Sequence, residues 1–196
     1  LSLAACGGSS SSSAGSSAAS ASGASSAASA SGETYKVGIC QLVTHDALDA
    51  ATQGFKDALE EALPGQVEFD EQNAANDPNT CNTIVNAFVS DGVDLILANA
   101  TPALQAAVAA TGDIPVLGTS VTEYGVALNI SDFNGTVGTN VSGTSDLAPL
   151  DQQAAMIQEL FPDAQKVGLL YCSAEPNSEY QVNTVASYLE EAGLET

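Results

Sequence analysis

The sequence predicts an α/β fold made of two lobes, each built on a parallel, doubly wound sheet with helices on both faces. Short apolar runs of strand length alternate with longer segments in which apolar residues recur at helical spacing. Proline and glycine separate these segments. A Gly/Asn/Ser-rich stretch at residues 129–143 has no helical period, and a new helix–strand–helix unit follows it. We therefore expect a first lobe over residues 35–145 and the beginning of a second, truncated lobe over residues 146–196.

The first lobe is predicted to begin with a strand–helix–strand unit. An apolar run at residues 37–42 predicts a buried strand. Residues 47–63 then carry apolar side chains at helical spacing, and the Pro-Gly pair at 64–65 ends this helix. A second strand is expected at residues 66–70, where apolar and polar residues alternate. A helix between two strands is the usual connection of parallel strands.

Two proline-containing pairs mark the starts of the next two helices. The Asp-Pro pair at 77–78 predicts an N-cap followed by proline in the first turn. The Thr-Pro pair at 101–102 repeats this pattern, with Thr101 as the expected N-cap. A strongly apolar strand at residues 95–98 lies between the two helices, and another strand at 115–118 follows the second. These repeats extend the predicted parallel sheet.

The second lobe is expected to start after a hinge near residues 144–146. The irregular stretch before it contains a short strand near Val141. After the hinge, the pattern predicts a helix at residues 150–160, a strand at 166–171 and a helix at 178–192.

The charge of the chain excludes some classes of partner. The net charge is −21, with three lysines and no arginine. Such a surface repels phosphate backbones, so we expect no nucleic-acid partner. The sequence also has no run of about 18 apolar residues, the length that a membrane-spanning helix needs.

The beginning of the chain resembles a bacterial lipobox. A Leu-Ala-Ala triplet at 3–5 precedes Cys6, and a Ser/Ala/Gly-rich tract follows it. We expect residues 1–6 to be a signal-peptide remnant, with Cys6 carrying the lipid, and residues 7–34 to be a disordered tether. These features would place the folded part outside the cytoplasm, lipid-anchored to the bacterial cell membrane. The alternative is an ordinary cysteine at a ragged start.

The remaining cysteines and the single histidine do not form a recognisable metal or disulfide motif. Cys40, Cys81 and Cys172 are an odd number without CxxC spacing, and we interpret them as packing or surface thiols. His45 has no second histidine with which to complete a zinc site. We expect no bound metal and no cofactor.

Ligands of open α/β sheets bind beyond the carboxyl ends of the strands. Four such ends are predicted here, at residues 41–45, 98–102, 118–122 and 171–178. The N–H groups at the helix start near Thr101 can hold a carboxylate, although Thr-Pro also caps purely structural helices. Asp146 can take an ammonium group or cap the next helix. His45 can face this edge or simply begin the first helix.

Sequence motifs for catalysis are absent. The chain has no G-x-S-x-G elbow, no phosphate-binding loop ending in Gly-Lys and no G-x-G-x-x-G. The many acidic residues mostly decorate helix faces, and no carboxylate pair stands out. We therefore expect a protein that is not an enzyme, with a surface hydrolase as an alternative that a serine-reactive probe would exclude.

Several short segments of the chain match the pattern of one known protein family, in the same order along the sequence. The first match is the segment at residues 37–57, with Val-Gly-Ile, Gln41 and His45. Ser-Asp-Gly-Val-Asp-Leu-Ile-Leu-Ala at 90–98 and Ala-Thr-Pro-Ala at 100–103 continue the series in order. The segments at residues 113–116, 140–146 and 166–178 complete the series. In these segments the chain resembles a family of ABC transporter substrate-binding proteins associated with tryptophan and tyrosine uptake.

This resemblance implies a two-lobed periplasmic-binding-protein-like fold that closes on a small solute and passes it to an ABC permease. The solute would be amino-acid-like, with an aromatic side chain suggested by the family analogy alone, and the protein would be a monomer. The ligand-binding positions implied by the family's strand-end segments are Gln41, His45, Thr101, Pro102, Ala103, Thr119, Ser120, Thr144, Ser145, Asp146, Tyr171, Asn177 and Ser178.

The sequence leaves a second function open. A ligand-sensing receptor module, which delivers its bound state to a membrane signalling protein, would have the same features. Neighbouring genes for a permease and an ATPase would favour transport, and a neighbouring kinase would favour sensing.

Overall fold

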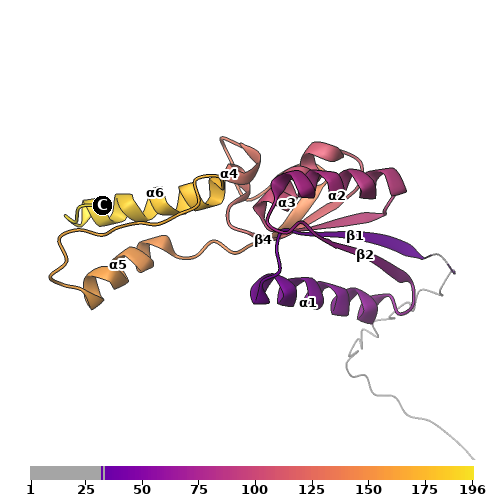
Figure 1. Cartoon of the computed structure of the whole chain (residues 1–196), viewed down its shortest axis with the longest axis horizontal. Coiled ribbons are helices and arrows are strands. Elements are labelled where there is room, and N and C mark those ends of the chain that lie inside the picture. The colour runs from indigo at the N-terminus through magenta and orange to yellow at the C-terminus, as the bar shows by residue number, and fades with distance from the viewer. Residues whose placement is uncertain (1–31, 33) are drawn as a thin grey trace, which may run out of the picture. The chain divides into compact units, whose positions relative to one another are not determined.

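The structure is a computed structural model that describes residue 32 and residues 34–196 (Figure 1). This part of the chain contains five strands and six helices. The predictions for the signal-peptide remnant at residues 1–6, for lipid attachment at Cys6 and for nearly all of the tether at 7–34 lie outside the described residues.

The first structural region is a five-stranded sheet in which all paired strands are parallel. The strand order is β2-β1-β3-β4-β5, so the chain moves to one side of β1 and then to the other. The point where the order reverses lies between β1 and β3. The strands are β1 (Tyr35–Gln41), β2 (Val67–Asn73), β3 (Leu95–Asn99), β4 (Val116–Val121) and β5 (Val141–Ser145).

Helices cover both faces of this sheet, as predicted for a doubly wound fold (Figure 1). On one face, Val37, Ile39 and Leu97 pack with Phe55 and Leu59 of α1 (Asp46–Ala62). The other face packs against α2 (Pro78–Asp91) and α3 (Thr101–Ala110). The buried residues on this second face include Cys40, Ile96, Ala98, Val85, Phe88, Leu104 and Ala107.

Successive residues of a strand point to opposite faces of the sheet, so the two faces carry different side chains. Gly38 lies opposite α2, and a Cβ atom added there would be 2.6 Å from the Phe88 ring. Glycine at this position therefore lets α2 approach the sheet closely.

The α2 helix starts as the sequence predicts. Asp77 is the N-cap, and its carboxylate accepts a hydrogen bond from the Asn79 N–H at 2.9 Å. Pro78 occupies the first turn, and Gly92 ends the helix with a left-handed φ of 65°. The backbone hydrogen bond from Asn79 holds the pKa of Asp77 below its ordinary value.

The expected cap of α3 is wrong by one residue. The N-cap is Ala100, with φ 94°, and its carbonyl accepts the first helical bond from the Leu104 N–H at 3.1 Å. Thr101 is already helical and makes no capping hydrogen bond. The chain turns at Ala100 because its N–H is held by the Thr119 carbonyl of the neighbouring strand, at 3.0 Å.

A short helix, α4 (Tyr124–Leu128), was not predicted. Its N-cap is Glu123, whose two carboxylate oxygens accept hydrogen bonds from the N–H groups of Gly125 and Val126, at 3.0 and 2.5 Å. Glutamate is not among the preferred N-cap residues, so the sequence carried little signal for this start.

The second region contains α5 (Leu150–Leu160) and α6 (Pro176–Glu191), which share a small core of Leu150, Ala154, Val185 and Leu189. The strand predicted at residues 166–171 is wrong. Within the described chain, Lys166 forms only an isolated parallel bridge with Glu195. A strand needs hydrogen-bonded neighbours, and no other described strand runs beside this segment. The predicted second sheet is therefore not formed by the described residues.

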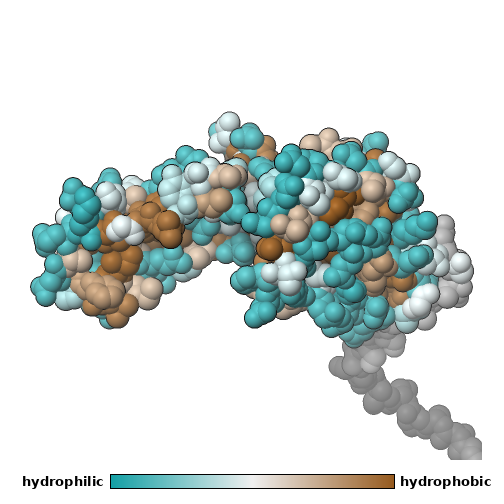
Figure 2. Space-filling view, in the orientation of Figure 1, coloured by the Kyte–Doolittle hydropathy of each residue, from teal (hydrophilic) through white to brown (hydrophobic). Residues whose placement is uncertain are grey.

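The surface of this second region is rich in apolar side chains (Figure 2). Leu160 and Phe161 are 64% and 63% exposed, and Leu170 is fully exposed. None of the described helices combines the length and the apolar character that crossing a bilayer requires.

Candidate functional site

Four polar residues form a row across the carboxyl ends of adjacent strands. Gln41 of β1 is in register with Asn73 of β2 on one side and with Asn99 of β3 on the other. Asn99 is in turn in register with Thr119 of β4. The pair Gln41–Asn99 lies at the point where the strand order reverses, which is where open α/β sheets bind their ligands. This edge is the candidate site.

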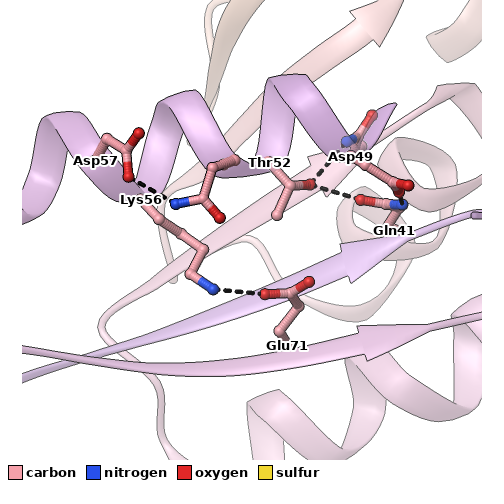
Figure 3. A network of polar contacts seen from close by, with 8 residues as sticks. Gln41, Asp49, Thr52, Lys56, Asp57 and Glu71 are labelled. Carbon is pink, nitrogen blue, oxygen red and sulfur yellow. Dashed lines mark hydrogen bonds and ion pairs between the residues drawn. The ribbon is translucent and has the colours of Figure 1, made fainter. Parts of the chain in front are cut away.

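A buried threonine of α1 links the two amides at the centre of this row (Figure 3). The Thr52 hydroxyl donates to Gln41 Oε1 at 2.7 Å. It accepts a hydrogen bond from Asn99 Nδ2 at 2.9 Å, and the same nitrogen donates to the Leu48 carbonyl at 2.8 Å. Side chains from two strands are thus fixed by one helix residue.

Both polar atoms of the Gln41 side chain are hydrogen-bonded inside the protein. Its Nε2 donates to the Val43 carbonyl at 2.9 Å and to an Asp49 carboxylate oxygen at 2.5 Å (Figure 3). Its side chain is buried, with the residue 4% exposed. The geometry makes Gln41 a residue that supports the edge of the sheet.

Asn99 was missed by the sequence analysis. It is fully buried, and its Oδ1 has no hydrogen-bond partner among the described residues. A polar residue that ends a strongly apolar strand just before a Thr-Pro pair was the signal available in the sequence. Buried polar atoms nearly always have a hydrogen-bond partner, so the unpaired Oδ1 of Asn99 is an exception at the carboxyl ends of the strands.

His45 begins the first helix, one of the two alternatives that the sequence left open. It is the N-cap of α1, and its Nδ1 accepts a hydrogen bond from the Ala47 N–H at 3.2 Å. The residue is exposed and follows the carboxyl end of β1.

Thr101, Pro102 and Ala103 form the first turn of α3, directly after β3. All three are buried, and Thr101 is 2% exposed. The first N–H groups of a helix have no partner within the helix, and its dipole makes this end positive.

Two neighbouring strand ends have left-handed backbone at residues other than glycine. Ala100 follows β3 with φ 94°, and Ser120 lies in β4 with φ 54°. Thr119 and Ser120 are both half-buried. Strained backbone of this kind persists where the surrounding structure fixes it, often beside a functional site.

The predicted hinge residues are tied to the end of β4. The Ser145 hydroxyl donates to the Thr122 carbonyl at 2.7 Å, and the Asp146 N–H donates to the Val121 carbonyl at 3.1 Å. Asp146 is exposed and does not cap α5, whose N-cap is Pro149.

Tyr124 lies across the last two strands. Its hydroxyl donates to the Thr144 carbonyl at 3.3 Å. The same hydroxyl occupies the space where a Cβ atom would lie at Gly118 or Gly143. Burial, followed by the negative charge of Asp146, raises the pKa of Tyr124 to about 12. Tyr124 is therefore a neutral hydrogen-bond donor at physiological pH.

The second region holds the remaining candidates. Tyr171 is 47% exposed, and the Ser178 hydroxyl donates to Glu175 Oε2 at 2.8 Å. The Oδ1 of Asn177 is buried and has no partner among the described residues. Tyr171 and Ser178 line a groove beside Leu169. Within the described chain, no hydrogen bond joins these residues to the candidates of the first region.

The thiols lie where the sequence analysis expected packing and surface cysteines. Cys40 and Cys81 are buried and Cys172 is exposed, all of them unbridged. A hydrogen bond with Cys81, together with burial, raises the pKa of the Cys40 thiol. The described residues contain no group of three or more side chains suited to hold a metal ion.

Residues 36–196 match the model of a protein family described as ABC transporter substrate-binding proteins. This chain belongs to that family. The resemblance that the sequence motifs indicated is therefore confirmed, and so is the periplasmic-binding-protein type of fold.

This substrate-binding chain is similar to one named relative and to two solved structures. It is 41% identical over 165 residues to a "Tyrosine-binding protein" from Clostridioides difficile, a match that covers 81% of this chain and 47% of the relative. A Streptococcus pneumoniae ABC domain in complex with L-Trp is 36% identical, with a TM-score of 0.77. A ligand-free, open substrate-binding protein with adhesive properties from Clostridium difficile is 40% identical, with a TM-score of 0.64.

The ABC substrate-binding chain spans about half the length of these proteins. The match to each of the two solved structures covers 83% of this chain and 56% of the chain in that structure.

Proposed function

We propose that this chain is the extracytoplasmic solute-binding component of an ABC importer that captures an aromatic amino acid and delivers it to a membrane permease. The observation that carries this proposal is the 41% identity to a tyrosine-binding protein across most of the chain. The 36% identity to a domain that holds L-Trp supports the same class of solute.

The carboxyl edge of the sheet can recognise the two charged groups of an amino acid. The first turn of α3, at Thr101 and Ala103, offers N–H groups, the Thr101 hydroxyl and a positive helix end to the carboxylate. The sequence has no arginine that could take this role instead. Asp146, exposed at the end of the sheet, would pair with the ammonium group. Tyr171 and Asn177 would close over the side chain when the two lobes come together.

The charge of the protein suits a zwitterion. A net charge of −21 repels anionic solutes, whereas an amino acid at neutral pH carries no net charge. We propose that the protein acts by binding alone, as a monomer, and that a lipid on Cys6 holds it to the cell membrane through the tether. The lipobox-like triplet before Cys6 supports the anchor.

Calorimetric titration of the full-length protein with L-tyrosine and L-tryptophan tests this proposal. We expect saturable binding with a dissociation constant on the order of micromolar or tighter, and competition between the two amino acids. A folded protein that binds neither would contradict the aromatic assignment.

Two site variants with matched controls test the binding mode. Asp146→Ala should weaken the binding of both amino acids. Asp113→Ala removes the same charge before β4, at the amino ends of the strands, and should leave the affinity unchanged. Thr101→Val should weaken binding and Thr101→Ser should retain it. Unchanged affinity in both Asp146→Ala and Thr101→Val would contradict the proposed contacts.

A further inference from the structure

We propose that Thr52 is a positioning residue for the solute site, because its hydroxyl sets the orientation of the Gln41 and Asn99 side-chain amides at the carboxyl edge. This inference rests on the proposed function and adds to it a residue on α1 that lies behind the strand ends.

The hydroxyl of Thr52 can satisfy only one arrangement of its neighbours. Its single hydrogen is donated to Gln41 Oε1 at 2.7 Å. Toward Asn99 it therefore offers a lone pair, and only the Nδ2 side of that amide can meet it, as it does at 2.9 Å. Thr52 is 3% exposed, so water does not compete for these bonds.

The orientation of Asn99 determines which of its atoms is left unpaired. Its two N–H groups are used on Thr52 and on the Leu48 carbonyl. Its Oδ1 is buried without a partner among the described residues. If the amide turned over, this oxygen would face the Leu48 carbonyl and two acceptors would meet. The hydroxyl of Thr52 and the Leu48 carbonyl thus keep Oδ1 as the acceptor on the other side of Asn99.

Both amides belong to residues at the strand ends that form the candidate site. Asn99 is followed by Ala100 with φ 94° and then by the first turn of α3. Gln41 Nε2 donates to the Val43 carbonyl just beyond β1. We therefore expect a change in the orientation of these amides to shift the strand ends on both sides of the reversal point.

Another polar contact between α1 and the sheet provides a control. Lys56 forms an ion pair with Glu71 at 2.8 Å, one turn further along α1 and away from the Gln41–Asn99 pair (Figure 3). Lys56→Gln removes a contact of the same helix without touching the two amides.

The first experiment compares solute affinity in the full-length protein. In calorimetric titrations with L-tyrosine and L-tryptophan, we expect Thr52→Val to bind about tenfold more weakly, since both amides lose their shared partner. Thr52→Ser keeps the hydroxyl and should bind like the wild type, as should Lys56→Gln. If Thr52→Val binds as tightly as Thr52→Ser, the proposal is overturned.

The second experiment does not depend on a ligand. The side-chain amide signals of Gln41 and Asn99 in ¹⁵N NMR spectra should exchange with solvent faster in Thr52→Val and remain slow in Thr52→Ser. Equal exchange in the two variants overturns the positioning role. If Thr52→Val does not fold, Thr52→Ala removes the same hydroxyl with a residue that favours helix. A wild-type protein that binds neither amino acid would refute the proposed function, while the amide signals still decide the role of Thr52.

Discussion

Two regions of the chain, residues 35–145 and residues 146–196, bury their apolar side chains to very different degrees. In the first region, both faces of a five-stranded sheet are packed against helices, and residues such as Ile39, Phe88 and Ile96 are at most 1% exposed. In the second region, two helices share four buried residues, and Phe161 and Leu170 are largely or fully exposed. Apolar content alone therefore does not determine which segments form a core.

Two segments that were both predicted to be strands illustrate this point. Residues 95–98 become β3 because β1 and β4 pair with it on either side. Residues 166–171 also contain apolar side chains, yet among the described residues their only strand-like pairing is the isolated bridge at Glu195, whose carbonyl accepts a hydrogen bond from the Val167 N–H at 2.8 Å. Apolar and β-branched residues suit a strand, but hydrogen-bonded neighbours are what make one.

The largest expected difference between the regions is in the cost of removing a phenylalanine. Phe88→Ala should lower the free energy of unfolding by roughly 3–5 kcal/mol, because it leaves a cavity between α2 and the sheet. Phe161→Ala removes the same ring from a position that is 63% exposed, and should change the free energy of unfolding by no more than about 0.5 kcal/mol. Urea denaturation of both variants measures this difference, and similar losses would show that the second region is also packed.

A smaller effect is expected from adding a methyl group. Gly38→Ala places a Cβ atom 2.6 Å from the Phe88 ring and should cost about 1–3 kcal/mol. Gly168→Ala meets no atom within 4 Å, so its thermal unfolding should match that of the wild type. Wild-type stability of Gly38→Ala would contradict the close approach of α2.

The boundary between the regions can be tested at Tyr124. Tyr124→Phe removes the hydrogen bond to the Thr144 carbonyl and should cost about 1 kcal/mol at neutral pH. The folded-state pKa of Tyr124 is raised from 10.0 to about 12, so the unfolded state ionises first. Its stabilising contribution is complete below pH 10 and is lost as the pH rises toward 12. Denaturation at about pH 8 and about pH 11 should show the gap between wild type and Tyr124→Phe narrowing, and a constant gap would refute this assignment.

The smallest effect is expected at a helix cap. Asp77→Ala removes the cap of α2 and should lower the melting temperature slightly at neutral pH. Because the folded-state pKa of Asp77 lies below 3.8, its contribution is present above that pH and is lost as the pH falls through the folded-state pKa. Glu60→Ala is the control, since it removes the same charge from an exposed position in the interior of α1. Equal shifts in the two variants would show that the Asp77 cap contributes nothing.

Sequence patterns predicted the elements whose residues repeat regularly. The helix expected at residues 150–160 is α5 with the same bounds, and the strand expected at 95–98 is β3 with one residue more. In these segments, local periodicity and the final packing agree, which is why they could be predicted.

The central residues of the candidate site could not be predicted, because their roles arise from tertiary contacts. Thr52 is one of many polar residues on an amphipathic helix, and only the packing of α1 on β1 and β3 shows that it is buried between two amides. The cap at Ala100 depends on a hydrogen bond to Thr119 in a neighbouring strand. Neither contact leaves a pattern in the sequence.

Both proposals place the solute at the carboxyl edge of the five-stranded sheet. Hydrogen–deuterium exchange of the full-length protein with and without saturating L-tyrosine tests this location directly. We predict slower exchange in peptides that cover residues 41–45, 99–103, 119–122 and 144–146, and unchanged exchange at the opposite edge, in residues 63–66 and 111–115. Protection confined to the opposite edge in a protein that binds tyrosine would contradict a site at the carboxyl edge.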